Sequence, residues 1–376
     1  HYAEKYDGRA PEFLAVPESE IASALDSIPN ELREALQVAA NRIEKFHRTQ
    51  TLEGETTTDD GITVETRHQP VLRAGCYVPG GRAAYPSTLL MTAIPAKVAG
   101  VSEVIVCVPP DASGSVNPAT LAAAKIAGVT SVYAIGGAQA IASLAYIQKV
   151  NKVVGPGNIY VVKAKKEVFG DVGIEGMVAG PSEITVVADK KTNLKEVITS
   201  LIAQAEHDVN SQCILISKDK SLIKNLNKNI SKNLKNLPRN KIARKSLKEN
   251  GLIIYAQNDK QIIEAINEIS PEHLELNIDN YKNYLNKIYN AGSICIGKYS
   301  PMAVTDYNSG TNHVLPTMGS AKFSSGLSVG EFYKKISHIK LSKKGIEKIG
   351  EYATHLAEYE ELEGHAQSIK SRIRRK

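Results

Sequence analysis

The chain has 376 residues, of which 42% are hydrophobic and 23% are charged, and its formal net charge is +6. This length can bury a large core and predicts two or more domains. The modest positive charge lacks the interleaved aromatic residues of a nucleic-acid-binding surface. No apolar run has membrane-spanning length and no signal sequence opens the chain, so the sequence predicts a cytoplasmic protein without a membrane partner.

Short apolar runs alternate with helical periods along the chain, which predicts an α/β fold with mostly parallel sheets. The early predicted elements are helices Glu18–Leu25 and Glu31–Arg48. The first series that follows contains strands Glu103–Val108, Ser131–Ile135, Lys152–Val154 and Glu183–Ala188 and helices Ser87–Val98, Ala119–Ala127, Ala138–Tyr146 and Ile159–Val168.

A second series has the same character and includes a long Lys- and Asn-rich helical stretch. Its other elements are helices Leu194–His207 and Gln261–Ile269 and strands Cys213–Ser217, Leu252–Tyr255, Leu274–Asn277 and Ser293–Gly297. The two series predict two Rossmann-like units. We expect the early helices to pack on the second unit and the chain after Leu341 to form a C-terminal helix.

The four cysteines are scattered along the chain without a CxxC pair, at Cys76, Cys107, Cys213 and Cys295. This spacing argues against both a disulfide framework and a cysteine zinc cluster. We therefore expect reduced and mostly buried thiols.

Gln204 and His207 are three residues apart on a predicted helix, so their side chains leave the same face and can share one cation. With the carboxylate of Asp306 and a second histidine, His365, they form a set that suits zinc better than calcium or magnesium. Each residue also has an ordinary explanation. A lone helical His is commonly a surface or core residue, Asp306 suits a turn, and His365 suits a helix end.

The neighbouring residues Glu272 and His273 form a candidate acid–base pair. Histidine is the side chain best matched to proton abstraction near neutral pH, and the adjacent carboxylate can activate water. Adjacent residues on a strand point to opposite faces, so both can serve one pocket only at an irregular strand entry, which Pro271 favours. The alternative is a surface glutamate beside a packing histidine.

Two glycine-rich turns precede predicted helices, at Gly80-Gly81 and at Gly155-Pro156-Gly157-Asn158, but no GxGxxG motif follows a strand. Such turns allow a phosphate to approach backbone N–H groups and a helix N-terminus. They are also ordinary connections between strands and helices. On its own this pattern leaves both interpretations open.

Eight sequence blocks in a fixed order give the chain a resemblance to the histidinol dehydrogenase family over essentially its whole length. The blocks are GCYVPGG (75–81), GGAQA (136–140), GPGN (155–158), AGPSE (179–183), QAEHD (204–208), PEHL (271–274), NHVLPT (312–317) and the segment from Glu360 to His365. The first residue is His1 and the family's N-terminal arm is missing, so we expect a fragment of a longer protein.

The resemblance implies one zinc ion per subunit, NAD as cofactor and an obligate homodimer in which the tail reaches the partner subunit's site. The implied zinc ligands are Gln204, His207, Asp306 and His365, and the implied NAD contacts are Tyr77, Gln139 and Asn158. Ser182, Glu360, His273 and the zinc ligands are the implied contacts of the substrate. The implied domains are residues 1–76 with 183–327 for zinc and substrate, an inserted NAD-binding unit at 77–182, and a tail at 328–376.

Several positions depart from the family pattern. The segment between Gln139 and Gly155 is shortened, and Asn151 stands where Asp is usual, which puts the edge of the NAD site in doubt. The other departures are Thr305 before Asp306, Gly326 where Pro is usual, and Gly364 before His365. None of them removes a predicted ligand.

The resemblance predicts the last step of histidine biosynthesis, the oxidation of L-histidinol through L-histidinal to L-histidine by two NAD molecules. In this reaction His273 would be the base and Glu272 the activator of water. Oxidation of another small alcohol is the near alternative. A zinc hydrolase without a nucleotide and a non-catalytic paralogue are more distant ones.

Overall fold

The computed structural model describes residues 4–5, 14–80, 84–178 and 180–373. Gly81 and Ala179, which belong to two of the sequence blocks, lie outside the described residues. The chain divides into two compact units. The first contains the chain up to Gln50 and Val71–Phe332, and the second contains Thr51–Pro70 and the segment from Tyr333. In the described part of the chain, no helix has both the length and the apolar character needed to span a bilayer.

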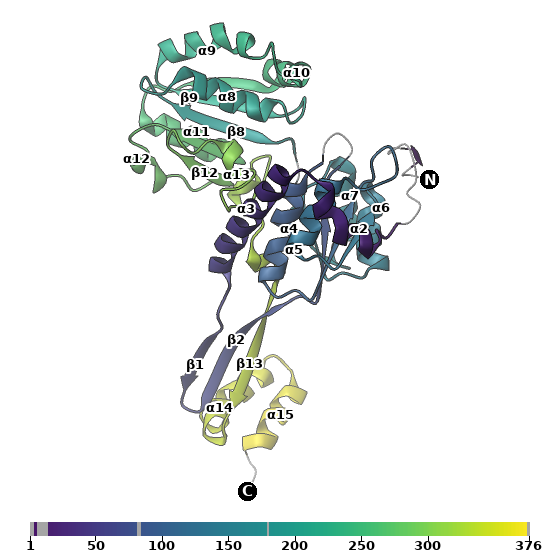
Figure 1. The fold of residues 1–376 in the computed structure, drawn as a ribbon. Helices are drawn as coiled ribbons and strands as arrows, with labels where there is room; N and C mark the ends of the chain where they lie inside the picture. Colours follow the sequence, from purple (N-terminus) through teal and green to yellow (C-terminus); the bar gives the residue numbers. More distant parts are fainter. Residues whose placement is uncertain (1–3, 6–13, 81–83, 179, 374–376) are drawn as a thin grey trace. The chain divides into compact units, whose positions relative to one another are not determined.

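The first sheet of the larger unit is parallel and has the strand order β5-β4-β3-β6-β7. The helices that connect its strands are labelled in Figure 1. Its strands are β3 (Arg73–Tyr77), β4 (Glu103–Val108), β5 (Ser131–Ala134), β6 (Lys152–Val154) and β7 (Gly173–Ile174). The connecting helices are α4 (Pro86–Val98), α5 (Pro118–Ala127), α6 (Gly137–Ala142), which continues as one π turn η3 (Ser143–Ile147), and α7 (Ile159–Glu167). Side chains from α6 and α7 form a buried apolar cluster with this sheet.

The second sheet of the same unit is also parallel and has the order β10-β9-β8-β11-β12. Its strands are β8 (Glu183–Ala188), β9 (Gln212–Ser217), β10 (Gly251–Tyr255), β11 (His273–Asn277) and β12 (Ser293–Ile296). Its helices are α8 (Leu194–Ala205), α9 (Lys220–Asn233), α10 (Asn240–Asn250), α11 (Asp259–Ile269), α12 (Lys282–Leu285) and α13 (Met302–Thr305). In both sheets the first strand in the chain is central, so the two sheets have the same strand order.

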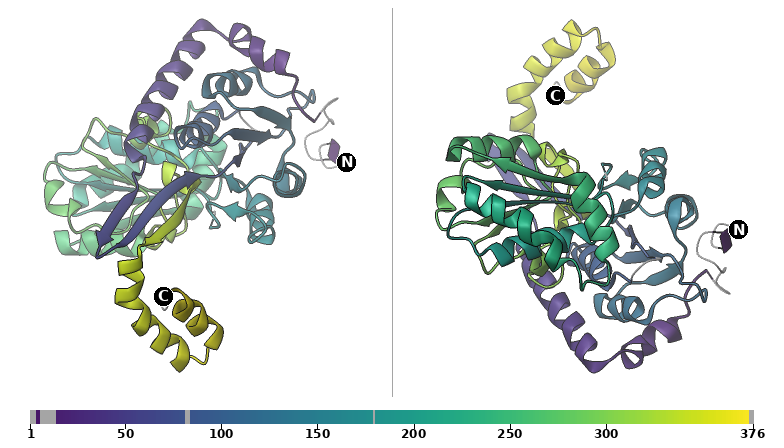
Figure 2. Two further views of the ribbon diagram at one scale, coloured as in Figure 1. Left: turned by 90° about the horizontal axis from the view of Figure 1, so that it is seen from below. Right: turned by 90° about the horizontal axis from the view of Figure 1, so that it is seen from above.

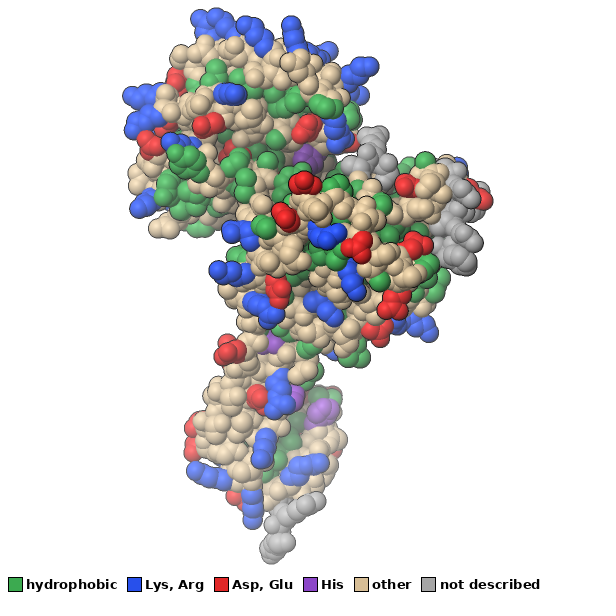
Figure 3. All heavy atoms as spheres, in the orientation of Figure 1, with side chains coloured by type: hydrophobic (Ala, Val, Ile, Leu, Met, Phe, Trp, Pro, Cys, Tyr) green, Lys and Arg blue, Asp and Glu red, His purple; other side chains and the backbone are tan. Residues whose placement is uncertain are grey.

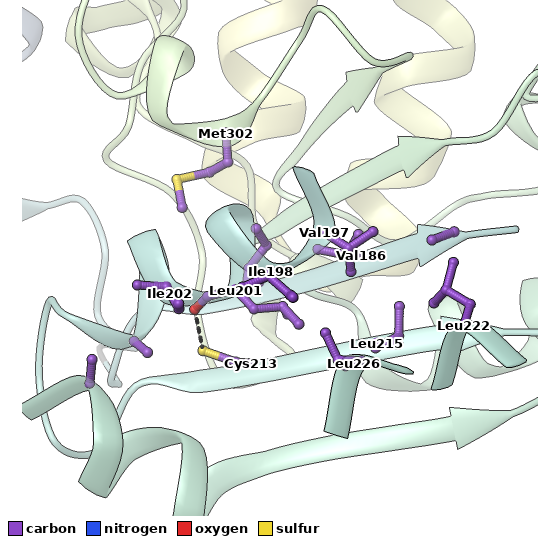
Figure 4. Close-up of a cluster of buried hydrophobic side chains, with 14 of the residues drawn as sticks. Val186, Val197, Ile198, Leu201, Ile202, Cys213, Leu215, Leu222, Leu226 and Met302 are labelled. Carbon is purple, nitrogen blue, oxygen red and sulfur yellow. Dashed lines mark hydrogen bonds between the residues drawn. The ribbon is translucent and has the colours of Figure 1, made fainter. Parts of the chain in front are cut away.

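Strand alternation divides the core around the second sheet into two apolar clusters. Val186 and Leu215 face α8 and α9, whereas their neighbours Val187 and Ile214 belong to the cluster with α11 and α12. Figure 4 shows the first cluster, where the Cys213 thiol donates to the backbone oxygen of Leu201 at 3.3 Å. All four cysteines are buried and free, as the sequence predicted.

The early helices are α2 (Glu18–Ser23) and α3 (Asn30–His47), with 3-10 turns η1 (Ala24–Ser27) and η2 (Arg48–Gln50). The expectation that they pack on the second Rossmann-like unit is wrong. They lie mainly against α4 and α5 of the first sheet (Figure 2), and the buried residues of α3 include Leu36, Ala39 and Ile43. Helix α3 also contacts the second half of the larger unit, which carries the second sheet, through Arg42, which donates to the Asn308 backbone oxygen at 2.6 Å.

The smaller unit contains an antiparallel sheet in the order β1-β2-β13 and two helices. Its elements are β1 (Glu55–Asp59), β2 (Ile62–Pro70), β13 (Tyr333–Leu341), α14 (Lys343–Tyr359) and α15 (Glu363–Ile373). These strands were not predicted, because β1 is polar and exposed throughout and β13 is exposed along nearly its whole length. The predicted helical C-terminal tail is confirmed, and it consists of α14 and α15.

The Lys- and Asn-rich stretch is helical, as predicted, and consists of two helices, α9 and α10. Lys and Arg side chains gather over this part of the surface in Figure 3. Leu222 and Leu226 of α9 are buried in the core and Ile223 packs against it, whereas Lys224 and Lys228 are exposed, so the lysines form the solvated face of an amphipathic helix. The remaining short 3-10 turns are η4 (Ser320–Lys322) and η5 (Val329–Phe332).

Candidate active site

The predicted acid–base pair lies at the amino end of β11. His273 is the first residue of that strand and pairs with Ile184 of β8 and Ser293 of β12. Glu272 precedes the strand, and Ser270 before it has a left-handed φ of 52°. The irregular strand entry that the sequence predicted is therefore present. Both side chains are almost fully buried, with exposed fractions of 6% for Glu272 and 3% for His273.

Three ionisable side chains converge at this edge of the sheet. His273 Nε2 lies 3.6 Å from Asp306 Oδ1 and 4.0 Å from Glu272 Oε1. The other oxygen of Glu272 accepts a 2.7 Å hydrogen bond from the Glu183 backbone N–H at the start of β8. Ser182 immediately precedes Glu183, so the structure brings this predicted substrate contact to the same edge.

Burial sets the protonation of the three groups. It raises the pKa of Asp306 to about 7 and raises the pKa of Glu272 well above its ordinary value. Burial, with smaller contributions from His313 and His207, lowers the pKa of His273 to about 3. His273 is therefore a neutral imidazole with a free lone pair, and the two carboxylates lie in a place where a cation would stabilise their charged forms.

Gln204 and His207 adjoin this cluster, but His207 is not helical as predicted. Helix α8 ends at Ala205, and His207 lies in the following turn, where its backbone N–H donates to the Gln204 oxygen at 3.2 Å. Gln204 is 1% exposed, whereas the His207 side chain reaches the surface. Although the side chain is accessible at the surface, partial desolvation of the ring and then the charge of Arg239 lower the pKa of His207, which favours the neutral imidazole that can ligate a metal.

The donor atoms at this edge fit a zinc ion. Four buried polar atoms of the residues around this edge lack a hydrogen-bond partner: Glu183 Oε2, Gln204 Nε2, His273 Nδ1 and Asp306 Oδ1. An amide, an imidazole and a carboxylate provide the N and O donors that zinc accepts. In the described part of the chain, no group of three His, Cys, Asp or Glu side chains can hold a metal alone. A zinc site here therefore needs the amide of Gln204 or a ligand from elsewhere.

Two further predicted site residues belong to the smaller unit. Glu360 is the C-cap of α14, and His365 lies in the first turn of α15, with its backbone N–H donating to the Leu362 oxygen at 3.0 Å. Both side chains are exposed. Their roles as substrate contact and zinc ligand stay predictions.

The predicted NAD contacts lie at the carboxyl edge of the first sheet. Tyr77 ends β3 and Gly155 follows β6, and between these adjacent strands the strand order reverses, which is where open α/β sheets bind their ligands. The Gly137 N–H donates to the Tyr77 hydroxyl at 3.1 Å, two residues before Gln139. Asn158 caps α7 by accepting from two of its N–H groups, Tyr160 and Val161.

The sequence analysis assigned no role to Glu183 or His313, which complete the site's framework. His313 Nδ1 lies 3.0 Å from the Asp306 backbone oxygen, and its Nε2 lies 2.9 Å from Thr88 Oγ1 in α4. This histidine therefore joins the loop of Asp306 to a helix of the first sheet. Its position in the NHVLPT block was the available signal. Glu183 lay next to Ser182 in the AGPSE block.

The whole chain is similar to proteins of one family. The family model described as histidinol dehydrogenase matches residues 1–373. Histidinol dehydrogenase from Pelagibacter ubique is 54% identical, covering 95% of this chain and 84% of that protein. The enzyme from Hydrogenovibrio crunogenus is 47% identical, covering 96% and 84% of the two chains.

Solved structures agree with these relatives. A crystal structure of histidinol dehydrogenase from Elizabethkingia anophelis superposes with a TM-score of 0.94 at 39% identity, covering 99% of this chain and 87% of that one. A propionaldehyde dehydrogenase from Clostridium phytofermentans shares the fold, with a TM-score of 0.52 at 13% identity and coverage of 88% and 99%. The resemblance inferred from eight short blocks is confirmed, and this chain belongs to the histidinol dehydrogenase family of oxidoreductases.

Proposed function

We propose that this chain oxidises L-histidinol through L-histidinal to L-histidine in the cytoplasm, with two NAD molecules in sequence and one zinc ion per subunit. The observation that carries the proposal is the buried convergence of Glu272, His273 and Asp306, with orphaned polar atoms beside Gln204. Family membership gives the substrate.

His273 acts as the base in the first oxidation. Its neutral imidazole takes the hydroxyl proton of the alcohol as the carbon loses hydride to NAD, which leaves the aldehyde. The first strand position fixes the backbone of His273, since both neighbouring strands pair with it, and the side chain is buried. Asp306, 3.6 Å from Nε2, then stabilises the protonated ring until the proton leaves.

Glu272 acts in the second oxidation. Its carboxylate removes a proton from the water that adds to the aldehyde, and the resulting hydrate has a hydrogen to lose as a second hydride. Its raised pKa makes it a stronger base than a solvated carboxylate. The bond from the Glu183 N–H fixes one oxygen at 2.7 Å and leaves the other turned toward His273.

Gln204, His207 and Asp306 would hold zinc, with His365 supplied by the tail of a partner subunit. The bound metal would polarise and orient the substrate as a Lewis acid without redox change. Ser182 lies at the same edge and would contact the substrate, with Glu360 of the partner subunit binding its amino group or imidazole. This sharing makes the active form a homodimer.

The NAD molecule would bind at the first sheet, in the inserted domain predicted at 77–182. Support comes from the reversal of strand order between β3 and β6, with Tyr77, Gln139 and Asn158 arranged around the same edge. The hydrogen bond from Thr88 to His313 connects this half of the site to the Asp306 loop.

The test is NADH formation from L-histidinol, before and after chelation, with histidine counted as product. The proposal expects two NADH per histidine, lost on chelation and restored by zinc. NADH formed only from a different alcohol would replace the substrate. A folded dimer that binds zinc but no NAD would favour a hydrolase, and one with neither NAD binding nor turnover would favour a non-catalytic paralogue.

A further inference from the structure

Two buried charged residues in the first half of the larger unit have no part in the chemistry described above. They are Lys165 of α7, with a 2% exposed fraction, and Glu175 after β7, with 8%. Burying charged groups is expensive unless hydrogen bonds and opposite charge compensate for it. Their contacts therefore indicate what these residues hold in place.

Both residues bind the same glycine. Lys165 Nζ donates to the Gly155 oxygen at 2.7 Å and to the Glu175 backbone oxygen at 3.0 Å. The Gly155 N–H donates to Glu175 Oε2 at 3.4 Å. The backbone donor and the backbone acceptor of Gly155 are thus both held by charged side chains.

Gly155 needs this support because its backbone conformation is unusual. Its φ is +105°, and a Cβ at this position would collide with the Tyr77 backbone oxygen. Gly155 opens the turn that leads through Asn158 into α7, beside the end of β3. The backbone conformation of Gly155 therefore helps to set the direction in which the N-terminus of α7 and its cap, Asn158, face the crevice between β3 and β6.

The charges around the pair are balanced. Lys152 of β6 lies close enough to influence both residues and makes its own 2.7 Å ion pair with Glu331. Two cations, Lys152 and Lys165, are thus grouped with two anions, Glu175 and Glu331. This balance allows Lys165 and Glu175 to stay buried without a net charge.

We propose that Lys165 and Glu175 are positioning residues for the dinucleotide, fixing Gly155 so that the GPGN turn is held in its NAD-binding conformation before NAD arrives. The inference rests on the proposed NAD site at this edge. It does not require either side chain to touch NAD. We call the hydrogen bonds of Lys165 and Glu175 with Gly155 the clamp. Loss of the clamp should weaken NAD binding and leave the binding of L-histidinol unchanged.

The test compares Lys165→Met and the double variant Lys165→Met/Glu175→Gln with the wild type. The double variant contains no unpaired buried charge, so it should be more stable than the single variant, which leaves Glu175 buried without Lys165. NADH binding without substrate is measured by fluorescence, together with KM for NAD, KM for L-histidinol and kcat. Glu103→Gln is the matched control, because it breaks the Arg73–Glu103 ion pair at the opposite edge of the same sheet.

We expect the NADH dissociation constant and KM for NAD to rise on the order of tenfold in both variants, as misplacement of a binding group does. KM for L-histidinol and kcat at saturating NAD should stay within about twofold, and the control should match the wild type. Unchanged NAD binding in the folded double variant would overturn the clamp. A rise of KM for NAD and KM for L-histidinol by the same factor would also overturn it. Wild-type protein that fails to bind NADH would instead overturn the proposed function.

Discussion

Replacing Glu272 by Gln separates the two oxidations while leaving the fold intact. The amide oxygen of Gln can still accept the bond that the Glu183 N–H makes at 2.7 Å, so the free energy of unfolding should fall by less than about 1 kcal/mol. The variant has no carboxylate to take a proton from water. Aldehyde oxidation should therefore slow on the order of 10²- to 10⁴-fold, whereas alcohol oxidation by His273 changes little.

The assay starts from L-histidinol and from L-histidinal in parallel and counts NADH and histidine, with released aldehyde trapped. Glu272→Ala is the comparison, because it leaves the buried Glu183 N–H without a partner and should cost about 1–3 kcal/mol of stability. His273→Asn should block both steps. Equal slowing of both steps by Glu272→Gln would refute the division of labour between the two residues.

Three other outcomes follow from the same geometry. His365→Ala should reduce the zinc content of the dimer, measured by metal analysis, whereas His355→Ala on exposed α14 should not; equal zinc in both would place His365 outside the metal site. The pKa of Asp306 is raised to about 7, so protons compete with zinc for its carboxylate near neutral pH. Zinc affinity, measured by competition with a chelator, should therefore fall as the pH drops through 7. An affinity that does not change with pH would contradict this. Gly155→Ala should destabilise the protein by about 1–3 kcal/mol in urea unfolding because φ is +105°, whereas Gly330→Ala, in ordinary contact distance of its neighbours, should be nearly neutral.

The parallel sheets could be predicted because their strands are short, apolar and separated by helical periods. β8 and β9 are buried along nearly their whole lengths, which gives the continuous apolar runs on which the prediction depended. The sheet of β1, β2 and β13 gives no such signal. Its strands are mostly exposed, and β13 pairs with β2 across more than 260 residues, as in the register of Tyr333 with Pro70.

The sequence predicted which residues belong to the candidate site, but not most of the contacts between them. The strand-entry position of His273 followed from Pro271 and from alternation along the strand. The bond of His313 to Thr88 did not, because it joins residues 225 positions apart and no local sequence period indicates it. The packing of α3 was misjudged for a similar reason, since its apolar stripe indicates burial but not the partner.

The matching strand order of the two sheets creates a hazard during folding, because a strand from one half could enter the other. One glycine opposes such an exchange at the centre of the first sheet. A Cβ at Gly75 of β3 would lie only 2.9 Å from the Leu144 side chain. The central strand of the second sheet, β8, reads Glu-Ile-Thr-Val-Val-Ala and has no glycine. A side chain at the Gly75 position would have to shift the Leu144 side chain, so this glycine favours β3 over β8 as the central strand of the first sheet.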